Sequence, residues 1–123
     1  MILLPAAVRV YFATAPCDLR RSFDGLSNQV REALGHDPLG GHVFVFLNRR
    51  KTQVKLLLWT RGGFTILHKR LEAGRFAFPQ QVTSTASCVA LDVHELGMLL
   101  EGIDMSRGTL SRRWKPAEAA SPA

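Results

Sequence analysis

The carboxylates of this 123-residue chain are the first candidates for chemistry. Transfer of a polynucleotide strand needs two or three carboxylates that converge on divalent metal ions, usually with the first one inside a strand. Each candidate here falls instead in a predicted turn, helix start or cap, and capping of backbone N–H groups is a sufficient role for Asp18 and Asp92. We therefore expect no catalytic residue among the acidic candidates, which are Asp18, Asp24, Asp37, Asp92 and Glu95.

The spacing of histidine and cysteine residues does not indicate a metal site or a catalytic nucleophile. His36 and His42 stand six residues apart, which matches no zinc pattern, and no cysteine is near them in sequence. Neither Cys17 nor Cys88 lies in a basic, helix-start context that would activate a thiol. The chain also lacks a nucleophile elbow, a P-loop and a dinucleotide-binding fingerprint. We expect no metal, no cofactor and no enzymatic activity.

The basic residues are the strongest signal, because they are concentrated rather than scattered. Residues 47–76 hold eight basic side chains and one acid, Glu72, whereas the other 93 residues hold eight basic and nine acidic side chains. The overall net charge of +6 therefore comes from one segment. Such concentration favours a surface that faces a polyanion such as nucleic acid. The alternative is a solvated strand face whose charges deter aggregation between sheet edges.

The hydrophobic pattern predicts one α+β domain. Alternating and β-branched runs predict strands at 8–13, 42–48, 53–60 and 64–71, of which the last three form an antiparallel meander with tight turns. An apolar stripe of Phe23, Leu26, Val30 and Leu34 predicts a helix over 20–34 that ends at Gly35. A short strand near 89–91 and a second helix at 92–103, beginning with an Asp92–Glu95 capping box, complete the domain. We expect four or five antiparallel strands packed against the main helix and a short C-terminal helix.

Alternation along 53–60 assigns its two faces. Val54, Leu56 and Leu58 look like core, whereas Lys55, Leu57 and Trp59 combine a cation, an aliphatic group and an indole on a face that we expect to be open. Arginine and lysine can contact phosphates, and tryptophan can stack on an exposed base. The predicted nucleic-acid-binding residues are Arg49, Arg50, Lys51, Lys55, Trp59, Arg61, Lys69, Arg70 and Arg75.

The domain is expected to span residues 1–105, followed by a flexible basic tail at 106–123. The tail contains Arg107, Arg112, Arg113 and Lys115, has no hydrophobic period and is rich in serine, proline and alanine. No apolar run reaches the 18 or so residues that cross a bilayer, and two cysteines 71 positions apart form no disulfide framework. We expect a cytoplasmic protein.

Three segments carry a family resemblance. They are DLRRSFDGL at 18–26, DPLGGHVFVFLNRRKTQVKLLLWTRGGFTILHKRLEAGRFAFP at 37–79, and LLEGID at 99–104. Together they resemble the TnpB accessory proteins of the insertion-sequence-66 family, which the short second reading frame of these bacterial mobile elements encodes. These proteins are unrelated to the RNA-guided nuclease of the same name. The resemblance covers about residues 8–104, most of the chain.

The resemblance implies a non-catalytic accessory factor for transposition, whose partner is a separate DDE transposase encoded by the same element. It assigns no established role to any residue, so the binding residues named above rest on charge and alternation alone. Two functions remain open at this stage. The basic block binds DNA at the element ends, or the domain is a protein-interaction module that docks the transposase without contacting DNA.

Overall fold

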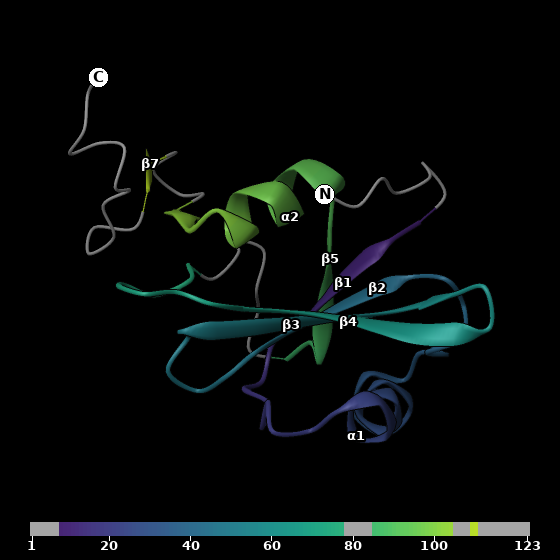
Figure 1. The fold of residues 1–123 in the computed structure, drawn as a ribbon. Helices are drawn as coiled ribbons and strands as arrows, with labels where there is room; N and C mark the ends of the chain where they lie inside the picture. The colour runs from purple at the N-terminus through teal and green to yellow at the C-terminus, as the bar shows by residue number, and fades with distance from the viewer. Residues whose placement is uncertain (1–7, 78–84, 105–108, 111–123) are drawn as a thin grey trace.

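The computed structural model describes residues 8–77, 85–104 and 109–110. Two helical segments and the first five strands follow the predicted order, and two short strands near the C-terminal end of the described residues were not predicted (Figure 1). In chain order these elements are β1 (Val10–Ala13), α1 (Phe23–Gln29), η1 (Val30–Leu34), β2 (Val43–Leu47), β3 (Gln53–Thr60), β4 (Gly63–Arg70), β5 (Cys88–Leu91), α2 (Val93–Leu100), β6 (Ile103–Asp104) and β7 (Thr109–Leu110). η1 is a turn of π-helix that continues α1.

Five strands form the main sheet, in the order β4-β3-β2-β1-β5. The β2–β3–β4 meander is antiparallel, as predicted, and β1 also pairs antiparallel with β5. One pair departs from the prediction, because β1 and β2 run parallel, with Val10 opposite Val43. The physical reason is the helical crossover: α1 carries the chain back over the sheet, so that β2 starts at the same end as β1.

The sheet is covered on both faces. α2 lies on one face and α1 with η1 on the other (Figure 1), and each face has its own apolar core. All five side chains of β2 are therefore buried. The core on the α2 face contains Val10, Phe12, Val43, Val45, Leu47, Val54, Leu56, Leu58, Phe76, Leu91, Leu96 and Leu99. The core on the α1 face contains Ala13, Cys17, Leu19, Leu26, Val30, Leu34, Phe44, Phe46 and Leu57.

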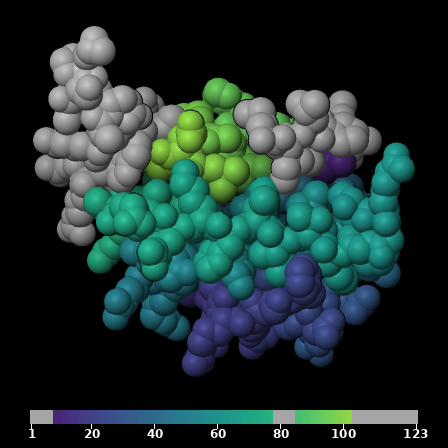
Figure 2. All heavy atoms as spheres, viewed as in Figure 1, coloured from purple at the N-terminus to yellow at the C-terminus, as the bar shows by residue number. Residues whose placement is uncertain are grey.

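β4 forms one edge of the sheet and has an open surface. Figure 2 shows its residues as a band between α2 above and α1 below. From Leu67 to Arg70 every residue of the strand is exposed, and Leu67 is 40% exposed. A strand at an edge leaves one row of backbone groups without a partner in its own sheet. This edge is available to a partner or to solvent.

The main helix begins and ends at residues that explain its limits. It starts at Phe23, later than predicted, and Ser22 caps it by position without a side-chain hydrogen bond. Gly35 ends it with a positive φ of 70°, as predicted. Leu26, Val30 and Leu34 are buried as the periodicity indicated, whereas Phe23 is 45% exposed. Phe23 is the first residue of the helix.

The second helix carries the predicted capping box. The Asp92 carboxylate accepts a hydrogen bond from the Glu95 backbone N–H at 2.7 Å, and the Glu95 carboxylate accepts one from the Asp92 N–H at 3.0 Å. The helix ends at Leu100, before the predicted limit of 103, because Gly102 adopts a φ of 76° and turns the chain.

Loss of this cap sets a first expected result. Asp92→Ala leaves the Glu95 backbone N–H without its side-chain acceptor and should lower the free energy of unfolding by about 1 kcal/mol. Thermal unfolding followed by circular dichroism should show a melting temperature about 4 °C lower. Asn28→Ala, at an exposed position of α1, is the control and should not lower the melting temperature, because alanine favours a helix more than asparagine does. An unaltered Asp92→Ala protein would mean that the capping box does not stabilise α2.

The predicted tail at 106–123 lies mostly outside the described residues. Within it, Thr109 and Leu110 pair with Ile103 and Asp104 in a two-stranded sheet. No helix within the described ranges is long and apolar enough to cross a lipid bilayer.

Candidate nucleic-acid interface

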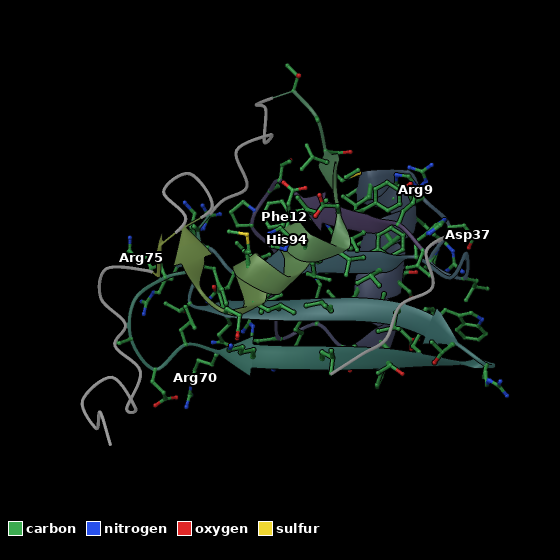
Figure 3. The ribbon with its side chains drawn as sticks, turned by 90° about the horizontal axis from the view of Figure 1, so that it is seen from above. Arg9, Phe12, Asp37, Arg70, Arg75 and His94 are labelled. Carbon is green, nitrogen blue, oxygen red and sulfur yellow. The ribbon has the colours of Figure 1, made fainter. Side chains whose placement is uncertain are left out.

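Three separate segments bring basic side chains to one end of the sheet. The β2–β3 hairpin turn supplies Arg49, Arg50 and Lys51, the end of β4 supplies Lys69 and Arg70, and the following loop supplies Arg75. Backbone hydrogen bonds hold these segments together, since Leu71 N–H donates to Thr52 O at 2.9 Å and Phe76 N–H to Lys51 O at 2.7 Å. Figure 3 shows Arg70 and Arg75 at this end and Arg9 and Asp37 at the other.

A fourth segment, which the sequence did not predict, joins this group. The loop before α1 carries Arg20, and Cys17 N–H donates to Leu47 O at 2.9 Å, which fixes the loop against the end of β2. We define the basic end as Arg20, Arg49, Arg50, Lys51, Lys69, Arg70 and Arg75. The sequence signal for Arg20 was the DLRRS run, but its place beside the hairpin depends on a contact between residues 30 positions apart.

Asn48 builds the turn that presents two of these arginines. Its side-chain carbonyl accepts hydrogen bonds from the backbone N–H groups of Thr52 at 2.9 Å and Gln53 at 3.0 Å. Its amide donates to the Thr52 hydroxyl at 3.1 Å. Lys51 closes the turn with a φ of 59°, a conformation that the surrounding bonds must hold. Arg49 and Arg50 therefore project from an ordered turn.

This role of Asn48 yields a second expected result. Asn48→Ala removes the acceptor of two backbone N–H groups and should lower the free energy of unfolding by about 2 kcal/mol. Asn48→Asp keeps that acceptor and should recover most of the loss. Urea unfolding of the two variants provides the measurement. Equal losses for both variants would show that the acceptor bonds do not stabilise the turn.

The arginines of the basic end differ in how much of their charge is available. Arg49 and Arg50 are exposed, and within the described part of the chain their guanidinium groups form no hydrogen bond or ion pair. Arg70 lies 3.8 Å from Glu72, an exposed pair that contributes little. Arg20 contacts Asp18 at 2.8 Å, and these hydrogen bonds lower the pKa of Asp18 to about 2. Arg49 and Arg50 are the charges best placed to meet an anion.

Lys55 does not lie on an open face, and the expectation of one was wrong. It is only 9% exposed, and Leu57 beside it is fully buried, because the loop before α1 and the helix itself cover this face of β3. The Lys55 ammonium donates to Arg21 O at 2.9 Å. This hydrogen bond holds the loop before α1, which contains Arg20, against β3. Its predicted contact with nucleic acid finds no support in this placement.

Arg21 and Lys69 are also engaged within the protein. The Arg21 guanidinium donates to the Gln29 side-chain carbonyl at 3.1 Å. Arg21 also lies against Gly25, and a Cβ added at Gly25 would come within 2.9 Å of the Arg21 Cβ. Gly25 therefore makes room for Arg21 against the helix. The Lys69 ammonium donates to Leu100 O, at the C-terminal end of α2, where a cation also offsets the helix dipole.

Trp59 and Arg61 lie apart from the basic end. They occupy the opposite end of the β3–β4 hairpin, about 25 Å away along an eight-residue strand. Trp59 is half-buried and packs edge-on against Phe64, with 4.9 Å between ring centroids. The nine residues predicted from sequence therefore do not form one surface. The structure brings six of them to one end, buries Lys55 beneath it and places the remaining two at the other end.

A hollow opens between the loop before α1 and the hairpin turn. Its volume is about 590 Å³, and we refer to it below as the hollow. His68 and Gln53 line it on the sheet side, with 2.7 Å between the His68 Nε2 and the Gln53 Oε1. Burial lowers the pKa of His68, and the nearby charges of Lys55 and Arg70 lower it further. The remaining lining residues are Pro16, Cys17, Asp18, Leu19, Arg20, Asn48, Arg49 and Arg50.

The described residues contain no cluster of side chains that could bind a metal ion. No three histidine, cysteine, aspartate or glutamate side chains gather there closely enough to hold an ion. Burial raises the pKa of Cys17 in the wall of the hollow, which disfavours its reactive thiolate form. What this arrangement offers is positive charge, hydrogen-bonding groups and a recess.

Comparison with known proteins agrees with the family resemblance. The model of a family described as IS66 Orf2 like protein matches residues 8–109. The uncharacterized protein y4hO of Sinorhizobium fredii is 34% identical over 119 residues, which cover 94% of this chain and 98% of that protein. The uncharacterized protein y4jC of the same organism is 33% identical over 100 residues, covering 81% and 83%. No solved structure matches. The chain belongs to the IS66 Orf2-like family of insertion-sequence accessory proteins.

Proposed function

We propose that this protein is a non-catalytic accessory factor that binds DNA through its basic end and assists a separate transposase of the same element. The observation that carries the proposal is the meeting of four chain segments at one end of the sheet, with the Arg49 and Arg50 side chains exposed and without partners in the described residues. The two guanidinium groups receive no stabilising hydrogen bond or ion pair from the described residues. The phosphate oxygens of a DNA backbone would provide both.

The size of the basic end predicts how binding should depend on salt. Six of its side chains are exposed or half-exposed at the hairpin side: Arg20, Arg49, Arg50, Lys51, Arg70 and Arg75. If each neutralises one phosphate, the logarithm of the binding constant should fall with the logarithm of salt concentration with a slope of about −5. None of these residues sits on a helix that could enter the major groove, so backbone contacts should dominate.

The test is a salt titration followed by fluorescence anisotropy. A labelled duplex carrying the terminal repeat of the element is compared with a scrambled duplex of equal length. The proposal predicts a steep slope on both duplexes, because phosphate contacts do not depend on sequence. Tighter binding to the terminal repeat would in addition make the protein a factor that recognises the element ends. Absence of binding to either duplex at low salt would contradict the proposal.

A second candidate function rests on β4. As an edge strand with an exposed Leu67, β4 could add a strand of the transposase to the sheet, without any contact to DNA. Capture of the transposase that persists after nuclease treatment and at high salt would favour this function. Capture that is lost under those conditions would leave DNA as the link between the two proteins.

A further inference from the structure

The hollow has a shape that a continuous duplex cannot use. Its volume of about 590 Å³ lies within the range of small-molecule sites. A duplex is a convex rod, so its backbone can contact Arg49 and Arg50 but cannot fill the recess that they line. A nucleotide that is not paired is free to turn inward. The hollow therefore fits a single unpaired nucleotide, whereas the basic end would contact the backbone of a duplex.

The lining matches the parts of one nucleotide. The Arg49 and Arg50 guanidinium groups suit its phosphate, and Pro16 and Leu19 offer apolar surface to a sugar or base. With the Gln53 carbonyl accepting from His68, the pair retains the second imidazole nitrogen as an acceptor and the Gln53 amide as a donor. An acceptor beside a donor is what the edge of a base requires for pairing-like hydrogen bonds.

The surrounding charge also favours an anionic ligand, because the Asp18 carboxylate in the lining is paired with Arg20, whereas Arg49 and Arg50 have no ion pair in the described residues. Burial lowers the pKa of His68, and the positive potential of Lys55 and Arg70 lowers it further, both of which favour the neutral imidazole. Neutral His68 retains its acceptor nitrogen, while the same potential attracts a phosphate. Lys55 and the Cys17–Leu47 hydrogen bond fix the wall of the hollow before any ligand arrives. A site fixed in advance loses little conformational entropy on binding.

We propose that the hollow binds one unpaired, phosphate-bearing nucleotide of a DNA strand, so that the protein prefers DNA with a single-stranded end to continuous duplex. This inference rests on the proposed function and narrows it. The basic end supplies contacts to the backbone of any duplex, and the hollow adds the discrimination for an unpaired end.

The experiment compares DNA molecules that differ only at their ends. The full chain is titrated with a blunt duplex, the same duplex with a three-nucleotide 3′ overhang and the same duplex with a 5′ overhang, all at one salt concentration. Binding to one of the overhang duplexes should be about tenfold tighter than to the blunt duplex. Deoxyadenosine monophosphate should compete away this extra affinity, whereas inorganic phosphate at the same concentration should compete less.

Variants separate the hollow from the rim. Gln53→Ala with His68→Ala should remove the preference for an overhang and leave binding to the blunt duplex unchanged. Arg9→Ala, at the far end of the sheet, is the matched control and should keep the preference. Equal binding of blunt and overhang duplexes by the wild-type chain would overturn the inference but leave the proposed function standing. Absence of binding to every DNA would overturn both.

Discussion

Replacing Arg49 and Arg50 together by alanine should weaken DNA binding about 30-fold at about 0.15 M salt. The reason is the release of counterions. Each phosphate that the protein neutralises contributes about 0.9 to the slope of the salt dependence, so two lost contacts should make the slope shallower by about two. Both side chains are exposed and without partners in the described residues, so their removal should not alter folding.

The control for this loss is Arg9→Ala. Arg9 carries the same charge and is also exposed, but it lies at the opposite end of the molecule from Arg70 and Arg75 (Figure 3). Its replacement should change the slope by much less than one. If Arg9→Ala and the double variant lost the same affinity per charge removed, net charge rather than the basic end would drive binding.

Lys55→Ala should lower the free energy of unfolding by about 3 kcal/mol. Two effects add: the Arg21 carbonyl loses the ammonium that donates to it at 2.9 Å, and the buried aliphatic stem of Lys55 leaves a void. Urea unfolding would measure the loss. The salt slope of DNA binding should change by much less than one, because the Lys55 ammonium is already bound within the protein.

Lys55→Met separates these two effects. Methionine keeps an unbranched stem and lacks the ammonium, so about 1–2 kcal/mol of the loss should remain. An opposite pattern, with unfolding unchanged and the salt slope shallower by about one, would restore the sequence-based interpretation of Lys55 as a phosphate contact.

Sequence patterns predicted those parts of the structure that depend on residues close together in the chain. Alternation placed β3 at 53–60, and the Asp92–Glu95 spacing identified a capping box that the structure contains. Gly35 was recognised as a helix end because only a residue that tolerates positive φ continues the chain there without strain. In each case the interactions join residues at most a few positions apart.

Contacts between distant segments account for what the sequence missed. Alternation correctly divided β3 into two faces, but it could not show that the loop before α1 would cover the face of Lys55 and Leu57. The same loop brings Arg20 to the basic end through the Cys17–Leu47 hydrogen bond. The parallel pairing of β1 with β2 likewise depends on a helical crossover rather than on either strand alone. The sequence therefore predicted most of the basic residues of the candidate site, but only part of their arrangement in space.

The most direct test of the account is to map the DNA contact by NMR. Backbone amide signals of the full chain would be followed as duplex DNA is added at low salt. The account predicts the largest shifts at residues 17–21, 48–53 and 68–71, which meet at the basic end, and small shifts at 60–64 on the opposite hairpin turn. Largest shifts at 60–64, around Trp59 and Arg61, or on the exposed surface of α2 would contradict the assignment of the DNA contact to the basic end.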